Sequence, residues 1–245
     1  MTVKSADRTL EVLEVLARSA TPLSLAELHD ELGYPKSSLY VLLQTMVERR
    51  WVETDARGSL YRVGVRALLA GTSYLDRDPV VRAAAPILEE VRSEVNETVH
   101  LARLDGGSIV YLASRESRHQ LRTVSRVGRR LPAYATALGR AILSQRPDGA
   151  DLVPEHPEAL SPRGLTDRRA ILAELDEFRR MHYSKESEQT NLGLGCRAVV
   201  LTYNDPVTDA LSCSVPLARL DEDHSRHIVD TLIDASRRIS ELLTR

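Results

Sequence analysis

Hydrogen-bonding side chains lie along one face of a predicted helix near the N-terminus. Residues 35 to 47 read PKSSLYVLLQTMV, and apolar positions recur at helical spacing at Leu39, Leu42, Leu43, Met46 and Val47. The opposite face carries Ser37, Ser38, Tyr40, Val41, Gln44 and Thr45. A glutamine amide can pair with adenine, hydroxyls can donate or accept, and a valine can contact the methyl group of thymine. We therefore expect this face to contact base edges of double-stranded DNA, with Lys36 and the start of the helix on phosphates.

Two further helices are predicted before this one. Ser24 and Glu27 make an S-x-x-E capping box that begins the nearer helix, and Gly33 ends it. Residues 6 to 18 predict the first helix of the chain. Its expected apolar stripe is Ala6, Leu10, Leu13, Leu16 and Ala17.

A basic hairpin follows the helix with the polar face. Short strands are predicted at 51–53 and 60–63, and the turn between them carries Arg57, which can enter the minor groove or reach a phosphate. This order of elements is typical of a winged helix-turn-helix. Residues 33–66 hold six basic and three acidic residues, although the whole chain has a net charge of −2. That balance argues against a non-specific DNA coat and suits binding through a dimer. The alternatives are a helical bundle with a hairpin and no role on DNA, or a winged helix that serves as a protein-interaction module.

The composition bounds the class of protein. The chain has 245 residues, of which 42% are hydrophobic, so it can form one or two domains with a sizeable core. Two cysteines, Cys196 and Cys213, do not make a disulfide framework. No apolar run approaches the roughly 18 residues that a membrane helix needs, and the first residues lack the apolar stretch of a secretory signal. We expect a cytoplasmic protein with no membrane partner.

The pattern beyond the hairpin predicts a second domain. Helices are expected at 65–77, 78–94, 137–144, 166–180 and 221–243, and strands at 98–104, 108–113, 120–126, 182–187, 197–203 and 209–215. The last helix is expected to bury Ile228, Leu232, Ala235, Ile239 and Leu242. Strands with helices at the ends and on one side indicate an α+β domain around an antiparallel sheet. The predicted division is a DNA-binding domain over 1–66, a helical linker over 67–80, and a larger domain over 81–245.

Three segments, in this order, resemble the IclR family of bacterial transcription regulators. They are the winged helix with PKSSLYVLLQTMVERRWV, the run VGRRLPAYATALGRAIL, and HYSKESEQTNLGLGCRAVVL followed by DALSCSVPLARL. The middle run is similar to the family's G-x-x-x-P-x-x-x-[AST]-x-x-G-[KR] element. Tyr183, Glu188, Gly193, Cys196 and Ser212 match the spacing of its late signature. The chain departs from the pattern at Tyr134, where many members have histidine.

The resemblance implies two domains of α+β class, a winged helix-turn-helix followed by an effector-binding domain with a GAF-like antiparallel sheet flanked by helices. It also implies homodimers, often paired into tetramers, and a small organic acid or aromatic metabolite as effector. Carried over to this sequence, the effector site comprises Leu131, Ala135, Thr136, Ala137, Leu138, Glu186, Cys196, Ser212 and Ser214. The residue types agree with that role. A helix beginning near Ala137 offers N–H groups to a carboxylate, and Ser212 and Ser214 alternate along one strand face.

Catalysis and metal binding find little support in the residues. Cys196, Ser212 and His100 can be imagined as a nucleophilic set, but the chain has no G-x-S-x-G elbow. His224 and His227 lie three residues apart without a converging Cys or carboxylate cluster, so no metal and no cofactor is expected. Three classes remain: an effector-controlled transcription regulator that binds a pseudo-palindromic operator as a dimer or tetramer, which the pattern favours; a constitutive DNA-binding or interaction protein whose larger domain only dimerises; and an enzyme with an accessory winged helix.

Overall fold

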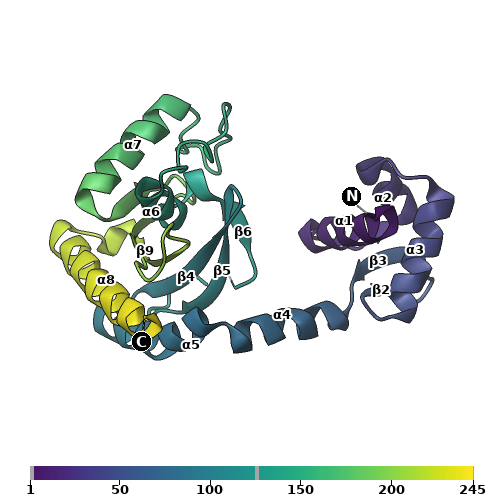
Figure 1. Ribbon diagram of the computed structural model, residues 1–245, viewed down its shortest axis with the longest axis horizontal. Coiled ribbons are helices and arrows are strands. Elements are labelled where there is room, and N and C mark those ends of the chain that lie inside the picture. The colour runs from purple at the N-terminus through teal and green to yellow at the C-terminus, as the bar shows by residue number, and fades with distance from the viewer. Residues whose placement is uncertain (1–2, 125–126, 245) are drawn as a thin grey trace. The chain divides into compact units, whose positions relative to one another are not determined.

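The computed structural model describes residues 3–124 and 127–244. The chain divides into two compact units, Met1–Asp76 and Arg77–Arg245, and the division lies inside the span that the sequence predicts as a linker (Figure 1). The elements of the first unit are α1 (Lys4–Arg18), β1 (Leu23–Ser24), α2 (Leu25–Leu32), α3 (Lys36–Glu48), β2 (Val52–Thr54), β3 (Leu60–Val63) and all but the last residue of α4 (Val65–Arg77).

The first unit buries one apolar core between its first three helices and a small sheet. Among the described residues, three strands pair in the order β1-β3-β2, with antiparallel ladders. The sequence did not predict β1, because Thr21 and Pro22 signal only a break, whereas Leu23 pairs with Tyr61. The core comprises Val12, Val15, Leu16, Leu28, Leu39, Leu43, Met46, Val52 and Tyr61.

The face that α1 buries differs from the predicted stripe. Val12, Val15 and Leu16 are buried, whereas Leu10 is 61% exposed. Ala6 and Ala17 are exposed as well, and Leu13 is half-buried. Because α1 has apolar side chains on two sides, its contacts with α2 and β3 decide which side is covered. Local periodicity cannot make that choice.

The signals predicted at the ends of α2 are confirmed. Ser24 Oγ accepts the N–H of Glu27 at 3.2 Å, and Glu27 Oε2 accepts the N–H of Ser24 at 2.7 Å. Gly33 ends the helix with a left-handed backbone, at φ 69°, which glycine adopts without strain. Pro35 precedes the first residue of α3. α3 buries one side, at Leu39, Leu43 and Met46.

The second unit is built on an antiparallel sheet. In its described part, six strands follow the order β6-β5-β4-β9-β8-β7. They are β4 (Thr98–Asp105), β5 (Ser108–Arg115), β6 (Arg130–Pro132), β7 (Ser184–Ser187), β8 (Leu194–Val200) and β9 (Asp209–Pro216). The helices are α5 (Pro79–Val95), α6 (Ala137–Gln145), α7 (Arg168–Met181) and α8 (Glu222–Leu243), with 3-10 turns η1 (Ala133–Ala135) and η2 (Leu217–Arg219).

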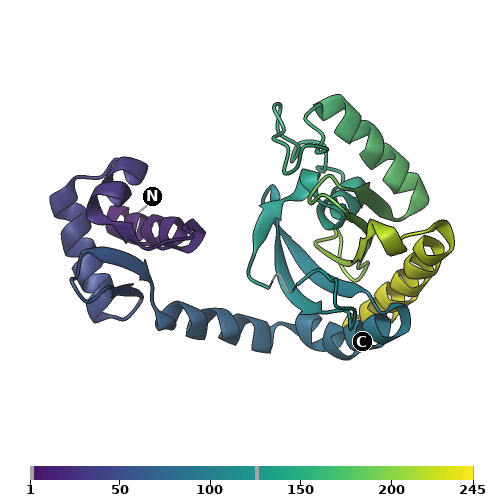
Figure 2. The same cartoon turned by 180° about the vertical axis from the view of Figure 1, so that it is seen from behind.

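Helices cover both faces of this sheet. α5 and α8 pack against each other, α5 along β4 and β5 and α8 along β8 and β9, and both views show them side by side (Figures 1 and 2). α6 lies on β8 and β9, and α7 packs on α6. The core on the α6 side joins Ala102, Ile109, Ala198 and Ala210 of the sheet to helix residues such as Ile142. The predicted α+β class is thus confirmed, with helices on both faces rather than one.

Two details of the predicted second domain are wrong. Residues 120–124 form no strand, and residues 125–126 of the same prediction lie outside the described part of the chain. The edge strand is β6, which pairs Leu131 with Ile109 of β5 and so occupies the free side of β5. In α8, Leu242 is 51% exposed, because the helix is buried only as far as Ile239 and Ser240. Over the described residues, none of the helices combines the length and apolar character of a membrane span.

Candidate nucleic-acid interface and ligand cavity

The polar face predicted on α3 lies on the surface of the first unit. Tyr40 is 51% exposed and Val41 66% exposed. Lys36, Ser37 and Thr45 are also exposed, whereas Ser38 and Gln44 are half-buried. An exposed valine and tyrosine beside small polar residues leave an apolar spot available to a partner surface. The arrangement therefore offers both hydrogen-bonding and methyl-contacting groups on one helix face.

Hydrogen bonds hold one side chain near each end of this face, Ser38 and Thr45. Arg8 of α1 donates from Nη1 to Ser38 Oγ at 3.2 Å, and the Arg8 guanidinium lies 4.5 Å from the ring centroid of Tyr34. Thr45 Oγ1 donates to the carbonyl of Val41 at 3.1 Å, so its hydroxyl can still accept. Arg8 thus lies beside the start of α3 as an additional cation, which the sequence analysis missed because it is distant along the chain.

The hairpin places Arg57 at an exposed turn. The Asp55 carboxylate accepts the N–H groups of Leu60 at 3.0 Å and Ser59 at 2.7 Å, and these hydrogen bonds lower the pKa of Asp55. Gly58 adopts φ 69°. The turn is therefore held by its own backbone contacts, which leaves the Arg57 side chain outside. Glu53 pairs with Arg62 at 3.1 Å on the strands behind it.

The second unit contains a narrow cavity on the α6 side of the sheet. The space between its atoms, open solvent included, is about 330 Å³, but the room for a water-sized molecule is only about 20 Å³, which is enough for about one water. The wall consists of Tyr111, Thr136, Ala137, Leu138, Glu186, Thr190, Asn191, Leu194, Cys196, Ser212 and Ser214. Strand register explains the sheet part of this wall, because Glu186 pairs with Cys196 and Cys196 with Ser214 across β7, β8 and β9. Directly paired residues point to the same face, and Ser212 lies two positions along.

The structure brings together most of the residues predicted for an effector site. Leu131 and Ala135 are the exceptions: Leu131 packs against the neighbouring core, and Ala135 is buried in η1. The sequence analysis missed Tyr111, Thr190, Asn191 and Leu194. Leu194 is two residues before Cys196, so strand alternation could have found it. The other three come from a separate strand and from a loop without periodicity.

The buried side chain of Arg140 holds the cavity wall together. Its Nε donates to the Tyr134 carbonyl at 2.6 Å, and its Nη1 donates to Glu174 at 2.6 Å and to the Gln189 side chain. The N–H of Gln189 in turn donates to Glu186 Oε2 at 2.9 Å. This arginine of α6 therefore connects η1, α7 and the loop after β7, which carry or adjoin wall residues.

The start of α6 is tightly defined. Thr136 Oγ1 accepts the N–H of Gly139 at 3.0 Å, so the helix begins at Ala137 on the cavity wall. A Cβ on Gly139 would lie 2.1 Å from the Ala133 carbonyl, which only glycine avoids. Tyr134, the departure from the family pattern, points elsewhere: its hydroxyl donates to the Glu158 carbonyl at 3.0 Å and accepts the Glu158 N–H at 2.9 Å.

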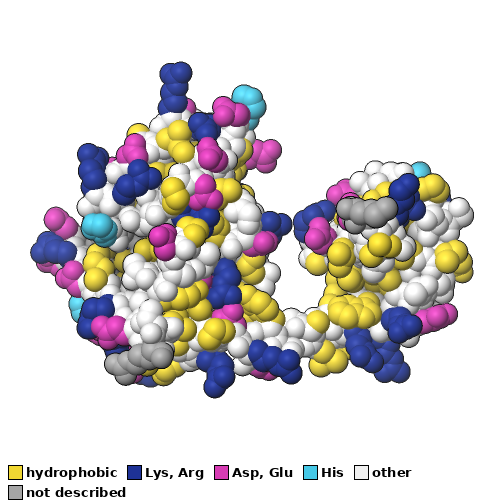
Figure 3. Space-filling view, in the orientation of Figure 1, with side chains coloured by type: hydrophobic (Ala, Val, Ile, Leu, Met, Phe, Trp, Pro, Cys, Tyr) yellow, Lys and Arg dark blue, Asp and Glu magenta, His cyan; other side chains and the backbone are white. Residues whose placement is uncertain are grey.

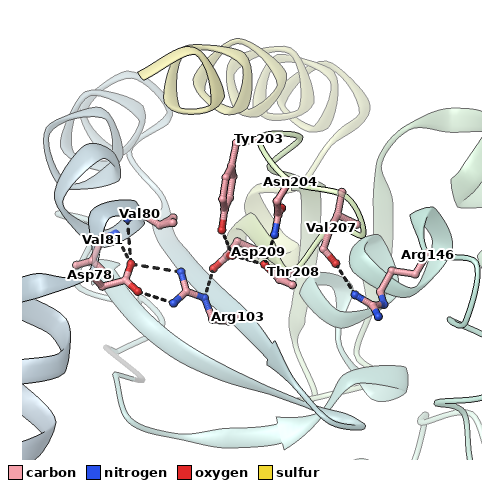
Figure 4. A network of polar contacts seen from close by, with 10 residues as sticks. All are labelled: Asp78, Val80, Val81, Arg103, Arg146, Tyr203, Asn204, Val207, Thr208 and Asp209. Carbon is pink, nitrogen blue, oxygen red and sulfur yellow. Dashed lines mark hydrogen bonds and ion pairs between the residues drawn. The ribbon is translucent and has the colours of Figure 1, made fainter. Parts of the chain in front are cut away.

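A charged network connects β9 to the first residues of the second unit (Figure 4). Arg103 of β4 donates from Nε to Asp209 Oδ1 at 2.8 Å and from Nη1 and Nη2 to Asp78. Asp78 also accepts the N–H groups of Val80 and Val81, both at 3.0 Å, and so caps α5. Asp209 additionally accepts the hydroxyl of Tyr203 at 2.6 Å. The strand that carries Ser212 and Ser214 is thereby tied to the start of α5.

Residues 5–56 match the family described as the IclR helix-turn-helix domain, and residues 72–241 match the bacterial transcriptional regulator IclR C-terminal domain. The chain belongs to the IclR family of bacterial transcriptional regulators. It is 31% identical over 244 residues to the HTH-type transcriptional regulator KdgR of Escherichia coli K12, covering 97% of this chain and 92% of that protein. It is 28% identical to XynR of the same strain, covering 98% and 97% of the two chains.

Solved structures of IclR proteins share the fold. An IclR transcriptional regulator from Alicyclobacillus acidocaldarius superposes with a TM-score of 0.86 at 23% identity, over 99% of this chain and all of the other. An IclR homologue from Microbacterium hydrocarbonoxydans, solved with 4-hydroxybenzoate, gives a TM-score of 0.79 at 23% identity over 98% of both chains. The two-domain IclR architecture predicted from the sequence is confirmed, and the chain is a DNA-binding transcription regulator.

Proposed function

We propose that two copies of this IclR regulator place their α3 helices in successive major grooves of a pseudo-palindromic operator, under the control of a small carboxylic acid bound in the cavity of the second unit. The face of α3 supports the first half of the proposal, because it offers Gln44, Val41 and hydroxyls to base edges. One such face covers few base pairs, so a specific site needs a second copy. Because a regulator of this kind acts on chromosomal DNA, we expect it in the cytoplasm.

The surface of α4 supports the dimer. Apart from Ala67 and Leu75, which are half-buried, its residues are exposed. Val65, Leu68, Leu69 and Tyr74 are between 49% and 63% exposed, and hydrophobic side chains gather along this helix (Figure 3). Val65, Leu68 and Leu69 lie on one side of the helix, and Tyr74 lies on the other. An exposed apolar row such as the first three is stabilised by covering it, and a second copy brings the same row in a two-fold arrangement. Pairing of dimers into tetramers is the further expectation from the family.

The charged network supports ligand control and is the observation that carries this part of the proposal. Ser212 and Ser214 line the cavity, and Asp209 begins the same strand. Asp209 is ion-paired with Arg103, and Arg103 with Asp78. Asp78 caps α5 and is the second residue of the second unit. A ligand that shifts β9 therefore shifts the start of α5. If the ligand binds one position of β9 and α5 more tightly than another, it favours that position, and with it one spacing of the two α3 helices.

Selection of bound fragments from the source genome identifies the operator, and substitutions then test the contacts. Gln44→Ala should weaken operator binding and relax specificity at one position, since a good base contact contributes about 1–3 kcal/mol. Arg57→Ala should weaken binding to all sequences and reduce the salt slope by about one. Arg180→Ala, an exposed arginine of α7, is the matched control and should change neither. If both test variants bind as the wild type does, the assignment of the DNA face is wrong.

Ligand control is tested on the same protein. Organic acids that bind the folded state raise the melting temperature, and each hit is then assayed for its effect on operator binding. Ser212→Ala with Ser214→Ala should weaken the ligand response and leave operator binding intact. Operator binding that no acid changes would favour the constitutive alternative, and turnover of an acid would favour the enzyme.

A further inference from the structure

The loop between β7 and β8 is the least firmly held part of the cavity wall. Thr190 and Asn191 of this loop line the cavity. The other wall residues lie in the paired strands β5, β7, β8 and β9 or at the buried start of α6. Leu192 at the tip of the loop is 58% exposed, and Thr190 and Asn191 are half-buried. A segment with few buried apolar contacts opens more easily than paired strands or a buried helix.

The two ends of this loop are tied to each other. The N–H of Glu188 donates to the carbonyl of Leu194 at 2.7 Å, and Glu188 Oε1 accepts the N–H of Gly193 at 2.8 Å. Ser161 Oγ donates to the Glu188 carbonyl, and Arg163 is ion-paired with the Glu188 carboxylate. Glu188 and Gly193 both have a left-handed backbone, at φ 59° and 77°. That conformation is strained for glutamate and easy for glycine, and such positions are typical of segments that switch between conformations.

Between these ends, hydrogen bonds hold residues 189–192 against the cavity. Thr190 Oγ1 donates to the carbonyl of Ala135 at 3.1 Å. The Gln189 side chain accepts from Arg140, and the Gln189 N–H donates to Glu186 Oε2 at 2.9 Å. One such hydrogen bond favours the closed position by roughly two- to tenfold, because water replaces it when it breaks. The open position is therefore accessible as a minor state.

The cavity needs such an opening, because it has room for about one water and an organic acid is larger. We propose that residues 189–192 are a lid that swings outward about Glu188 and Gly193 and admits the ligand. This inference rests on the proposed ligand control and adds the route by which the ligand enters. The lid also contacts the end of β9, because the Gly193 carbonyl accepts the N–H of Leu217 at 2.8 Å, directly after that strand. A lid that closes on a ligand therefore acts on β9.

Cysteine labelling of the full-length protein measures the opening without a ligand. Cys196 belongs to the wall of the same cavity, and burial raises the pKa of its thiol, so it reacts slowly while the lid is closed. Cys213 points to the opposite face of the sheet and is fully buried, so it reports global unfolding. Iodoacetamide is added at constant pH, and mass spectrometry after digestion gives the two rates, each relative to its rate in urea. Cys196 should react about tenfold or more faster than Cys213, because local opening costs less than global unfolding.

Substitutions in the lid should speed the labelling of Cys196. Gly193→Ala strains the closed hinge and Thr190→Val removes a hydroxyl that holds the lid, so each should raise the rate by about three- to tenfold. Gly106→Ala is the matched control, because Gly106 has φ 58° in the turn between β4 and β5 and a Cβ there, as at Gly193, meets nothing within 4 Å. The control should speed Cys213, since strain lowers the stability of the whole unit, and leave Cys196 unchanged. If Gly193→Ala does not fold, Thr190→Val decides.

The outcomes separate the lid from ligand control. Equal rates for the two cysteines in the wild type, or a Cys196 rate that rises in Gly106→Ala as much as in the lid variants, would show access by global unfolding and overturn the lid. An acid that raises the melting temperature should slow the labelling of Cys196, and one that leaves this rate unchanged would overturn the lid as its route of entry. If the lid variants speed Cys196 and no acid binds, the opening is supported and the proposed control by a small acid is what fails.

Discussion

Replacing Arg103 with methionine should destabilise the second unit strongly and leave the first unit unchanged. The Arg103 side chain is 22% exposed, and its partners are more deeply buried, with side-chain exposures of 6% for Asp78 and 0% for Asp209. Methionine keeps most of the length of the chain and removes the guanidinium. Two buried carboxylates would then lose their cation at the same time.

The expected cost is about 3–5 kcal/mol at neutral pH, the range for breaking a buried ion pair by removing one partner. The remaining hydrogen bonds keep it from rising further, because Tyr203 and Thr208 still donate to Asp209 at 2.6 and 2.7 Å. The cost should also depend on pH. Burial raises the pKa of Asp78, but hydrogen bonds from Arg103 and from the Val81 N–H outweigh it, and the net pKa lies below the ordinary 3.8.

A group with a lowered pKa in the folded state contributes stability above its ordinary pKa, and this contribution is lost as the pH falls through the lowered value. The difference between wild type and Arg103→Met should therefore be full at neutral pH and shrink below pH 3.8. A constant difference across that range would show that the lost contribution is packing of the arginine stem rather than its charge.

Urea unfolding followed by two signals separates the units. The chain has one tryptophan, Trp51, in the first unit, so its fluorescence reports that unit, while far-UV circular dichroism reports both. Arg103→Met should move the dichroism transition to lower urea and leave the fluorescence transition in place. Arg180→Met is the exposed control. A change in unfolding free energy below about 1 kcal/mol, the level of a surface pair, would refute the reasoning.

Further predictions concern local geometry. Ser24→Ala removes the acceptor that caps α2 and should cost about 1 kcal/mol, seen in the fluorescence transition. Gly139→Ala should cost about 1–3 kcal/mol or displace η1, because the new Cβ would lie 2.1 Å from a carbonyl oxygen. A Cβ at Gly71, in the middle of α4, meets nothing within 4 Å, so Gly71→Ala should stabilise the protein by about 0.5–1 kcal/mol. Urea unfolding measures both changes, and a more stable Gly139→Ala than Gly71→Ala would contradict the prediction. Cys213 is fully buried and burial raises its pKa, so maleimide should label it only after unfolding, and rapid labelling of the native protein would disprove its burial.

Local signals predicted the first unit well wherever the cause of the structure is local. The capping box at Ser24, the left-handed Gly33 and Pro35 before α3 each act within a few residues, and the structure contains all three. The buried side of α1 and the strand at Leu23 depend on contacts with distant residues. A helix with two apolar sides gives periodicity no basis for choosing between them.

The cavity residues likewise separate into those that local spacing predicts and those that depend on distant contacts. Alternation along β9 placed Ser212 and Ser214 on one face, and the structure has both on the cavity wall. Tyr111 joins that wall only because β5 pairs with β4, and β4 with β9, which no spacing along the chain reveals. The predicted strand at 120–126 was wrong for a related reason. A strand needs a free edge to pair with, and β6 occupies the edge that β5 offers.

The position of β9 explains how one strand can serve both the cavity and the network. β9 lies between β4 and β8, its residues from Asp209 to Pro216 are all buried, and both neighbours are antiparallel to it. Because side chains alternate, Ser212 and Ser214 face the cavity, while Asp209 belongs to the opposite set and meets Arg103, its direct partner on β4. A strand held by ladders on both sides cannot bend locally at low cost, since that breaks buried hydrogen bonds. A ligand that displaces the two serines is therefore expected to displace Asp209 with them, and the ion pair to Asp78 would transmit that displacement to the cap of α5.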